Sequence, residues 1–218
     1  MNPSSRYDIS DLPEAQAEPG SRGRVLRNKL GIKSKREMNE AESVALKTAI
    51  DKLVYMYDDE HCFTAEDIRT MHKVWLGDIY EWAGEYRQVN LSKGDFHFAS
   101  AMHIPQLMEE LQKVQLYKHT PCNFKSPERV IKALAEVHVE LVLIHPFREG
   151  NGRTARILST LMAFQAGLSM LNFKDITGGK RKHYFAAVNS GMNRDYRPME
   201  KLFEKIIATT QKTKSGEI

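Results

Sequence analysis

The stretch LVLIHPFREGNGRTARILS, residues 141–159, interrupts an apolar run with charge. It starts and ends with aliphatic side chains, but its middle holds a histidine, a glutamate, two glycines around an asparagine, and three arginines. Burying such charges without partners costs several kcal/mol or more for each group. The segment is therefore either a solvated loop or a place where the charges meet a charged ligand.

Proline and glycine determine the local structure of this stretch. Pro146 disfavours helical backbone at the preceding residue, so the helix before the loop should end at His145. Gly150 and Gly152 allow unusual backbone angles, and helical sequence resumes at Arg153. Backbone N–H groups at a helix start bind anions, and glycines let an anion approach them closely. The sequence thus predicts a helix, a short loop and a helix N-terminus that binds an anion.

The arginines support a polyphosphate ligand. Arg153 and Arg156 lie three residues apart, so both can face one side of the first helical turn. Two guanidinium groups at the positive end of a helix are unfavourable unless an anion joins them. Ala155 stands where a dinucleotide fingerprint would have its third glycine, and a Gly-Lys-Ser/Thr phosphate loop is absent. His138 and His145 lack the further ligands of a zinc site, and His138 fits better as a packed core histidine.

Composition limits the class of protein. The chain has 218 residues, of which 41% are hydrophobic and 28% charged, which suits one globular domain with a short arm. Lys and Arg (32) outnumber Asp and Glu (28) by only 4, too few to indicate nucleic-acid binding. No membrane span or signal peptide is predicted, and the isolated Cys62 and Cys122 fit a reducing compartment. These features favour a cytoplasmic protein and leave secretion into a host cell open.

Helical spacing of apolar residues predicts a mainly α-helical chain. Thr64 with Asp67 is a helix-start signal whose helix we expect to end at Gly84, and Ser126 with Pro127 starts another. The predicted helices cover about 36–57, 64–84, 104–117, 126–144, 152–166, 179–190 and 197–210.

The two ends of the chain have no sustained apolar period. Residues 1–24 are predicted to form an arm, docked by Tyr7 and Leu12, and residues 211–218 a frayed tail. The domain itself should then span residues 25–210.

One segment, QVNLSKGDFHFA, breaks the helical pattern. Val89 and Leu91 alternate on one arm and Phe96 and Phe98 on the other, with a Lys-Gly-Asp turn between, which predicts a β-hairpin. A lone hairpin is marginal in water. It is either a structural edge packed on the helices or a flap that receives an extended partner strand.

The central stretch carries a recognisable pattern. His145-Pro146-Phe147-Arg148-Glu149-Gly150-Asn151-Gly152-Arg153-Thr154-Ala155-Arg156 agrees with the Fic pattern H-x-F-x-[D/E]-G-N-G-R-x-x-R at every specified position. The segments NKLGI and WAGEYRQVNLSKGDFHFA extend the similarity over about residues 25–205. The chain therefore resembles the Fic (Fido) family. This resemblance implies an all-α helical core with a small β-hairpin flap. It also implies transfer of AMP from ATP to a Tyr, Thr or Ser hydroxyl of a target protein.

The resemblance and the chemistry of the side chains agree on roles. His145 is the expected general base, an effect of about 10²–10⁴ in rate. Glu149 is a hard oxygen ligand for Mg²⁺, and Arg153 completes the catalytic set. By resemblance Arg156 reaches the γ-phosphate, and Phe147 anchors the loop. The residues predicted to bind ATP are Phe147, Gly150, Asn151, Gly152, Arg153, Arg156, Tyr184 and Asn189. Those predicted to bind the target as a flap are Val89, Asn90, Leu91, Ser92, Lys93, Gly94 and Phe96.

Other functions remain compatible with parts of the sequence. Some proteins that resemble the Fic family transfer UMP, phosphate or phosphocholine instead of AMP. A non-catalytic helical module could use the basic stretch RGRVLRNKLGIKSKR on nucleic acid, but it would leave the histidine, glutamate, asparagine and arginine set unexplained.

Control of the activity is a separate question. Many Fic proteins carry an inhibitory helix with the pattern [S/T]-x-x-x-E-[G/N], whose glutamate pairs with the second arginine of the motif. Ser10 to Glu14 and Thr213 to Glu217 have this spacing, but Ala and Ile follow the glutamates. The sequence therefore predicts that a separate small antitoxin-like protein supplies the glutamate, or that the enzyme is unregulated and toxic when expressed alone.

Overall fold

The centre of the fold is a pair of buried helices joined by the charged loop. The structure is a computed structural model that describes residues 12–94, 96–176 and 181–215. Helices α5 (Pro127–Ile144) and α6 (Asn151–Gln165) pack against each other, and most of their side chains are buried. Their all-round apolar character confirms the prediction of a central core helix after the loop.

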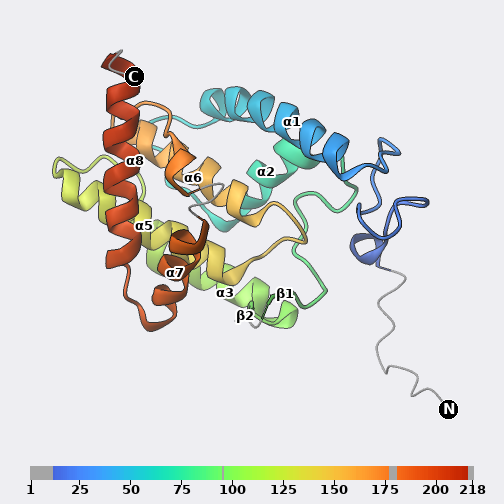
Figure 1. The fold of residues 1–218 in the computed structure, drawn as a ribbon. Helices are drawn as coiled ribbons and strands as arrows, with labels where there is room; N and C mark the ends of the chain where they lie inside the picture. Colours follow the sequence, from blue (N-terminus) through green and yellow to red (C-terminus); the bar gives the residue numbers. More distant parts are fainter. Residues whose placement is uncertain (1–11, 95, 177–180, 216–218) are drawn as a thin grey trace.

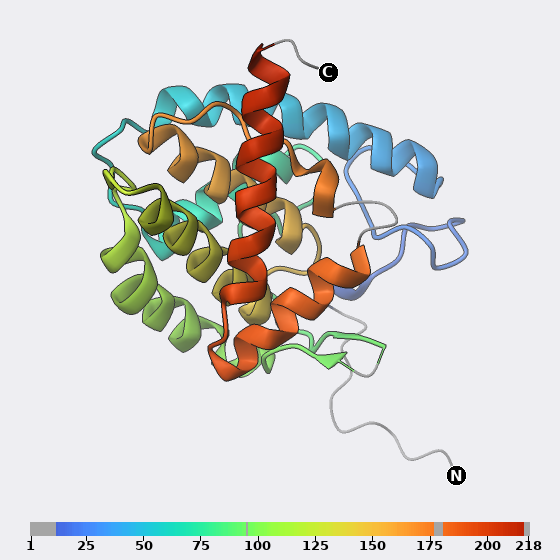
Figure 2. The ribbon, with the colours of Figure 1, turned by 60° about the vertical axis from the view of Figure 1, so that its left-hand side comes forward.

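Two layers of helices surround this pair (Figures 1 and 2). One layer packs on α6, and the other covers α5. The first layer consists of α1 (Lys35–Met56) and α2 (Ala65–Leu76), and the second of α3 (Ile104–Leu111), α7 (Arg181–Ser190) and α8 (Arg197–Ser215). The prediction of an all-α core is confirmed. No helix among the described residues combines the length and apolar character needed to span a membrane.

Helix starts follow the predicted capping signals. The Thr64 hydroxyl accepts a hydrogen bond from the backbone N–H of Asp67, and the Asp67 carboxylate accepts one from the backbone N–H of Thr64. Ser126 caps α5, with Pro127 at its first position. Both caps satisfy backbone donors that a helix start leaves unpaired.

The predicted end of the second helix was wrong. Helix α2 stops at Leu76, and Gly77 rather than Gly84 follows it. The apolar pattern continues because Ile79 and Tyr80 are buried within a turn, with their N–H groups donating to the Leu76 carbonyl. Gly84 ends this turn in a left-handed conformation, with φ at +87°.

Two further boundaries differ from the prediction. Helix α8 continues to Ser215, so residues 211–215 are helical rather than frayed. The helix predicted over 104–117 is divided into α3, a π-helical segment η3 (Gln112–Leu116) and α4 (Tyr117–His119). The described residues also form short 3₁₀ helices, namely η1 (Pro13–Ala15), η2 (Ala101–His103), η4 (Phe173–Ile176) and η6 (Gly191–Asn193).

The predicted hairpin is present. Strands β1 (Ser92–Lys93) and β2 (Phe96–His97) pair antiparallel, and the N–H of Phe98 donates to the Leu91 carbonyl. Gly94 has φ at +59°, which suits the turn. Asp95 lies outside the described residues. The Lys93 ammonium lies 3.7 Å from the centre of the Phe185 ring, so the hairpin is attached to α7.

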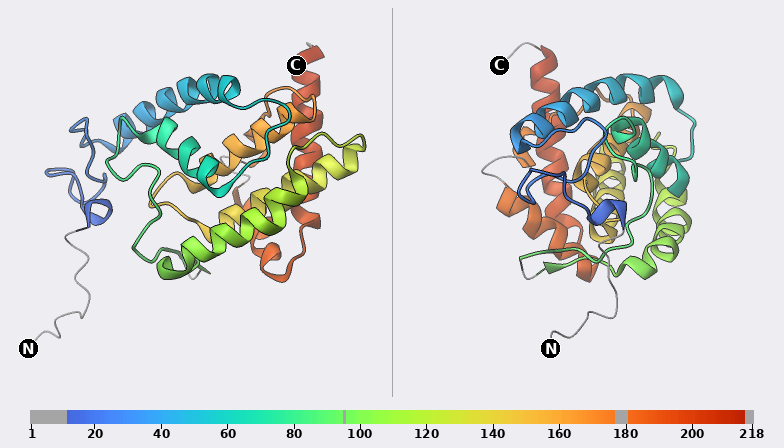
Figure 3. Two further views of the ribbon diagram at one scale, coloured as in Figure 1. Left: turned by 180° about the vertical axis from the view of Figure 1, so that it is seen from behind. Right: turned by 90° about the vertical axis from the view of Figure 1, so that its right-hand side faces the viewer.

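The N-terminal arm lies across one end of the helices, between α1 and the hairpin (Figure 3, right). Its predicted anchor Leu12 is only half-buried, and Tyr7 lies outside the described residues. The arm is instead attached through Glu14, which is 5% exposed. The Glu14 carboxylate accepts hydrogen bonds from the backbone N–H groups of Gln88 (2.6 Å) and Val89 (3.0 Å), where the hairpin segment begins.

Candidate active site

His145 occupies an unusual backbone conformation at the end of α5. Its φ of 54° and ψ of 57° lie in the left-handed region. The following Pro146 disfavours right-handed helical geometry at His145, so α5 ends here. The Arg87 guanidinium donates to the His145 carbonyl at 2.7 Å and to the Val89 and Ala99 carbonyls at 2.7 and 2.6 Å. This fully buried arginine therefore connects the loop after α5 to both ends of the hairpin.

Asn151 closes the loop on itself. Its amide oxygen accepts from the Phe147 N–H at 2.8 Å, and its amide nitrogen donates to the Phe147 carbonyl at 2.7 Å. The Phe147 ring is fully buried and stacks on His72 with centroids 3.9 Å apart. The anchor role predicted for Phe147 agrees with this position. The Asn151 side chain, which was predicted to hold phosphates, instead forms its hydrogen bonds with the loop backbone.

Gly150 is required where the loop becomes helix α6. Its φ is +84°, and a Cβ atom here would lie 2.7 Å from the Trp75 ring. The Gly150 carbonyl accepts from the N–H groups of Arg153 and Thr154, both at 2.9 Å, and so starts the helix. The N-terminus of α6 therefore faces the loop as a ready anion site.

Two adjoining hollows meet at His145. The first, of about 470 Å³, lies over the start of α6 and is called here the phosphate hollow. The second, of about 620 Å³, lies under the hairpin and is called the flap hollow. Both are lined by Lys93, Val142, His145, Arg148, Glu149 and Phe185. A ligand could thus place one end in each hollow and its middle beside the histidine.

The phosphate hollow is strongly cationic. Its lining includes one carboxylate, Glu149, against six positive side chains. They are Lys35, Lys93, Arg148, Arg153, Arg156 and Arg181. Lys35 and Arg181 were not among the residues predicted from the sequence, because they lie outside the motif and reach it only through the fold. This excess of positive charge suits a polyphosphate.

His145 is held as a neutral base. Its Nδ1 lies 3.0 Å from the Val142 carbonyl, which can only accept, so Nδ1 carries the proton and Nε2 is free to accept one. Burial lowers the pKa of His145 to about 4, and the positive charges of Arg87 and Lys93 act in the same direction. The histidine is therefore unprotonated near neutral pH.

Glu149 is held as a charged acid. Burial alone would raise the pKa of Glu149, but the Gly150 N–H and the positive charges of Arg153, Lys35 and Arg148 outweigh it and lower this pKa. Its Oε1 accepts from the Gly150 N–H at 2.9 Å and lies 3.3 Å from Arg153 Nη2. The described residues hold no cluster of three or more His, Cys, Asp and Glu side chains that could bind a metal by themselves. Mg²⁺ commonly takes one carboxylate together with substrate phosphates and water, so Glu149 fits this ion in the presence of a nucleotide.

The two arginines of the motif differ in their contacts. Arg153 pairs with Glu42 of α1 at 2.6 Å, a contact that the sequence gave no reason to expect. Arg156 also lines the phosphate hollow, but within the described part of the chain it has no ion-pair partner. Burial lowers the pKa of Arg156, and Tyr184 beside it partly opposes that change.

Two residues predicted near the adenine lie at different hollows. Tyr184 lines the phosphate hollow, and its hydroxyl lies 2.9 Å from His138 Nε2. His138 is buried and also contacts Ser159 Oγ at 3.0 Å, which confirms it as a packed core histidine. Asn189 lines the flap hollow. The structure therefore does not bring these two residues to one hollow.

The predicted flap residues fall into two groups. Val89 is buried and Asn90 accepts from the Ala101 N–H at 2.8 Å, so both attach the hairpin to the rest of the protein. The others line the flap hollow, namely Leu91, Ser92, Lys93, Gly94 and Phe96. Phe98, which the prediction did not include in the site, stacks on the His145 ring.

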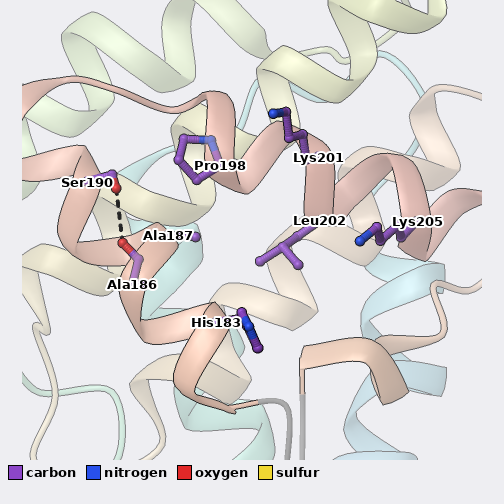
Figure 4. Close-up of a pocket in the computed structure, with 8 residues that line it drawn as sticks. All are labelled: His183, Ala186, Ala187, Ser190, Pro198, Lys201, Leu202 and Lys205. Atoms are coloured by element: carbon purple, nitrogen blue, oxygen red, sulfur yellow. Dashed lines mark hydrogen bonds between the residues drawn. The ribbon is translucent and has the colours of Figure 1, made fainter.

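A separate hollow between α7 and α8 is shown in Figure 4. Its volume is about 500 Å³, and its lining is mainly apolar, with Lys201 and Lys205 projecting from α8. No residue of the 145–156 loop lines it. We therefore assign the candidate active site to the two hollows that meet at His145.

The chain is similar to known proteins. Residues 62–163 match the model of the Fic/DOC family. The chain is 26% identical over 194 residues to the probable protein adenylyltransferase Fic of Escherichia coli K12, covering 84% of this chain and 88% of that relative. It is 30% identical over 171 residues to the protein adenylyltransferase VbhT of Bartonella schoenbuchensis, covering 74% of this chain but 33% of VbhT.

Solved structures give the same fold. The type IV secretion system effector protein BepA superposes with a TM-score of 0.68 at 27% identity, covering 89% of this chain and 68% of BepA. BepC from Bartonella tribocorum, solved with bound AMPPNP, gives a TM-score of 0.67 at 25% identity, covering 83% of this chain and 91% of BepC.

Proposed function

Because residues 62–163 match the model of the Fic/DOC family, we propose that this protein is an adenylyltransferase that moves AMP from ATP to a hydroxyl group of a target protein. The observation that carries the proposal is the meeting of the two hollows at His145, with six positive side chains on the phosphate side. The names of the relatives, which are protein adenylyltransferases, support the same reaction class. The AMPPNP bound to BepC supports ATP as the nucleotide.

His145 is the proposed general base. The hydroxyl oxygen of the target attacks the α-phosphorus, and the bond from this phosphorus to the oxygen that bridges to the β-phosphate breaks. The hydroxyl proton passes to His145 Nε2, and pyrophosphate leaves. Support comes from the Nδ1 contact to the Val142 carbonyl, which keeps the Nε2 lone pair available.

The phosphates are held by the N-terminus of α6 and the cations around it. The backbone N–H groups at Gly150–Gly152 and the Arg153 guanidinium face the α- and β-phosphates, and Arg156 faces the γ-phosphate. Glu149 would hold a Mg²⁺ ion in the presence of the nucleotide. When bound, this ion stabilises negative charge on the leaving pyrophosphate.

The hairpin is the proposed dock for the target. An extended segment of the target adds as a strand beside β1 or β2 and presents its hydroxyl to the flap hollow. Support comes from the short strands and from the six hairpin residues that line this hollow. The target then lies on the side of His145 opposite to the triphosphate.

Inhibition is proposed to come from a separate antitoxin-like protein that offers a glutamate to Arg156. Within the described residues Arg156 has no ion-pair partner, whereas the Glu14 carboxylate is bound to backbone N–H groups of the hairpin segment. Glu217 lies outside the described residues. The chain alone should therefore be active, and should become toxic when expressed without its inhibitor. We propose that it acts in a cytoplasm, which its two free cysteines suit.

The test is incubation of the purified chain with Mg²⁺, cell lysate, and ATP labelled in either the α- or the γ-phosphate. Protein should take up the α-label and not the γ-label. Uptake of the γ-label would indicate phosphate transfer. Stronger labelling from UTP or CDP-choline would indicate one of the other transferred groups. Absence of any labelled protein, in lysates from several cell types, would count against group transfer altogether.

A further inference from the structure

Glu42 is a fully buried carboxylate beside the catalytic loop. It lies on α1, is 0% exposed, and belongs to a segment that precedes the matched family region. Its Oε2 lies 2.6 Å from Arg153 Nη1, and its Oε1 accepts a hydrogen bond from the Tyr80 hydroxyl at 2.7 Å. Both oxygens are therefore occupied, which fixes the direction of the carboxylate.

Trp75 contacts both Glu42 and Arg153. Its Nε1 donates to the Glu42 carbonyl at 2.9 Å, and the Arg153 guanidinium lies 4.5 Å from the centre of its ring. A guanidinium over an indole ring gains a favourable cation–π contact. Arg153 is thus located by a carboxylate at its edge and by an aromatic ring on its face.

A second carboxylate competes for this arginine. Glu149 Oε1 lies 3.3 Å from Arg153 Nη2, longer than the 2.6 Å contact to Glu42. A guanidinium can pair with one carboxylate through two parallel hydrogen bonds, and such a pair is stronger than a single contact. Without the charge of Glu42, Arg153 would be free to form that pair with Glu149. Each would then neutralise the other within the phosphate hollow.

We propose that Glu42 is a positioning residue that holds Arg153 on the α1 side of the phosphate hollow and thereby prevents its full pairing with Glu149. This inference rests on the proposed function, because it gives Arg153 the task of binding phosphate. It adds a residue from outside the motif to the nucleotide site.

The test is nucleotide binding by the Glu42→Gln variant. Glutamine keeps the size of the side chain and one acceptor oxygen, but it removes the charge. The Kd for ATP, measured by calorimetry in EDTA, should rise about tenfold, because Arg153 turns to Glu149. Glu40→Gln removes a charge from the exposed face of the same helix and should leave the Kd unchanged. An unchanged Kd for Glu42→Gln would overturn the proposal.

A double substitution separates positioning from general damage. Combining Glu42→Gln with Glu149→Ala removes the competing carboxylate, so ATP affinity should return to that of Glu149→Ala alone. An affinity as weak as that of Glu42→Gln would mean that Glu42 acts through folding only, and the proposal would fail.

A milder variant keeps the test decisive if Glu42→Gln does not fold. Tyr80→Phe keeps the charge of Glu42 but removes one of its hydrogen bonds, and should raise the Kd about threefold. A Tyr80→Phe variant with wild-type affinity would then overturn the proposal.

The outcome is distinguishable from failure of the proposed function. Wild-type protein that binds ATP but transfers no α-label would contradict the adenylyltransferase activity alone. Wild-type protein that transfers the label, with Glu42→Gln binding ATP equally well, would contradict the positioning role alone.

Discussion

The ring of His145 stacks on the ring of Phe98, with centroids 3.6 Å apart and an angle of 19° between the planes. Phe98 follows β2, so the base of the proposed reaction is covered by a residue of the hairpin that is proposed to receive the target. The contact excludes water from one face of the imidazole. The contact therefore joins the hairpin to the proposed base.

Phe98→Leu should change the pH dependence of transfer. Burial lowers the pKa of His145 to about 4, so a neutral base should persist well below pH 6.5 in the wild type. Losing the ring admits water, and this pKa should rise toward its ordinary value of 6.5. The acid limb of kcat/KM should move upward accordingly, whereas Phe98→Tyr, which keeps the ring, should leave it in place. Arg87, Lys93 and Glu149, which also act on His145, are unaltered in both variants. An acid limb that coincides in wild type and Phe98→Leu would contradict this reading of the stack.

His145→Ala should abolish transfer while ATP still binds. The side chain lies at the junction of the hollows, and the cations that face the phosphates remain in place. Loss of a general base typically costs about 10²–10⁴ in rate. Label transfer and calorimetric ATP binding should be measured on the same preparation. Retention of more than a few per cent of wild-type transfer would rule out His145 as the base.

Glu149→Ala should remove the Mg²⁺ dependence of the reaction together with most of its rate. This carboxylate is the only acid lining the phosphate hollow, within the part of the chain that the structure describes. The measurement is transfer as a function of Mg²⁺ concentration. A variant with the wild-type Mg²⁺ response would place the metal on other groups.

Leu91→Pro should weaken modification of the target more than binding of ATP. Leu91 accepts a hydrogen bond from Phe98 and leads into β1, and proline disturbs strand geometry there. The KM for a target protein and the Kd for ATP report the two effects separately. Equal losses in both would make the hairpin a structural edge rather than a docking strand.

Folding stability should fall as the pH drops from about 6.5 toward 4. Burial lowers the pKa of His72 to about 4 and that of His138 to about 3, as it does for His145. Because the unfolded chain takes up these protons first, the stability contribution is complete above the unfolded pKa and is lost below it. Urea unfolding at several pH values should show this slope, and His138→Gln should reduce it. The pKa of Glu136 is lowered from 4.5 to about 2, so its contribution is lost as the pH falls from 4.5 toward 2, a window that overlaps the lower end of the histidine window.

The sequence predicted those parts of the structure that depend on local signals. Thr64 with Asp67 and Ser126 with Pro127 start helices through contacts a few residues apart, and the loop from His145 follows from its proline and glycines. The end of α2 was misjudged because buried residues in a turn continue an apolar pattern without being helical. Local signals of this kind carry no information on residues that the fold alone brings near.

The contacts that position the site could not be predicted because they join distant segments. Glu42 meets Arg153, Phe98 meets His145, and Arg87 bonds the loop carbonyls, and each pairing depends on how the helices pack. In isolation Glu42 is one of several acids on a polar helix, and only its burial singles it out. Arg87 likewise has the sequence context of an ordinary surface arginine.

The Glu14 contact has a consequence for where this protein can be divided. The family match begins at residue 62, yet Glu14 binds the start of the hairpin segment, and its carbonyl accepts from Arg148 at 2.9 Å. A fragment that begins at residue 62 would keep the whole motif from His145 to Arg156. It would lose Glu14, which contacts both the hairpin segment and Arg148 of the loop. The contacts that attach the hairpin and the loop thus extend beyond the residues that match the family model. A tag, fusion or cleavage near Glu14 should therefore disturb the hairpin and the loop beside His145.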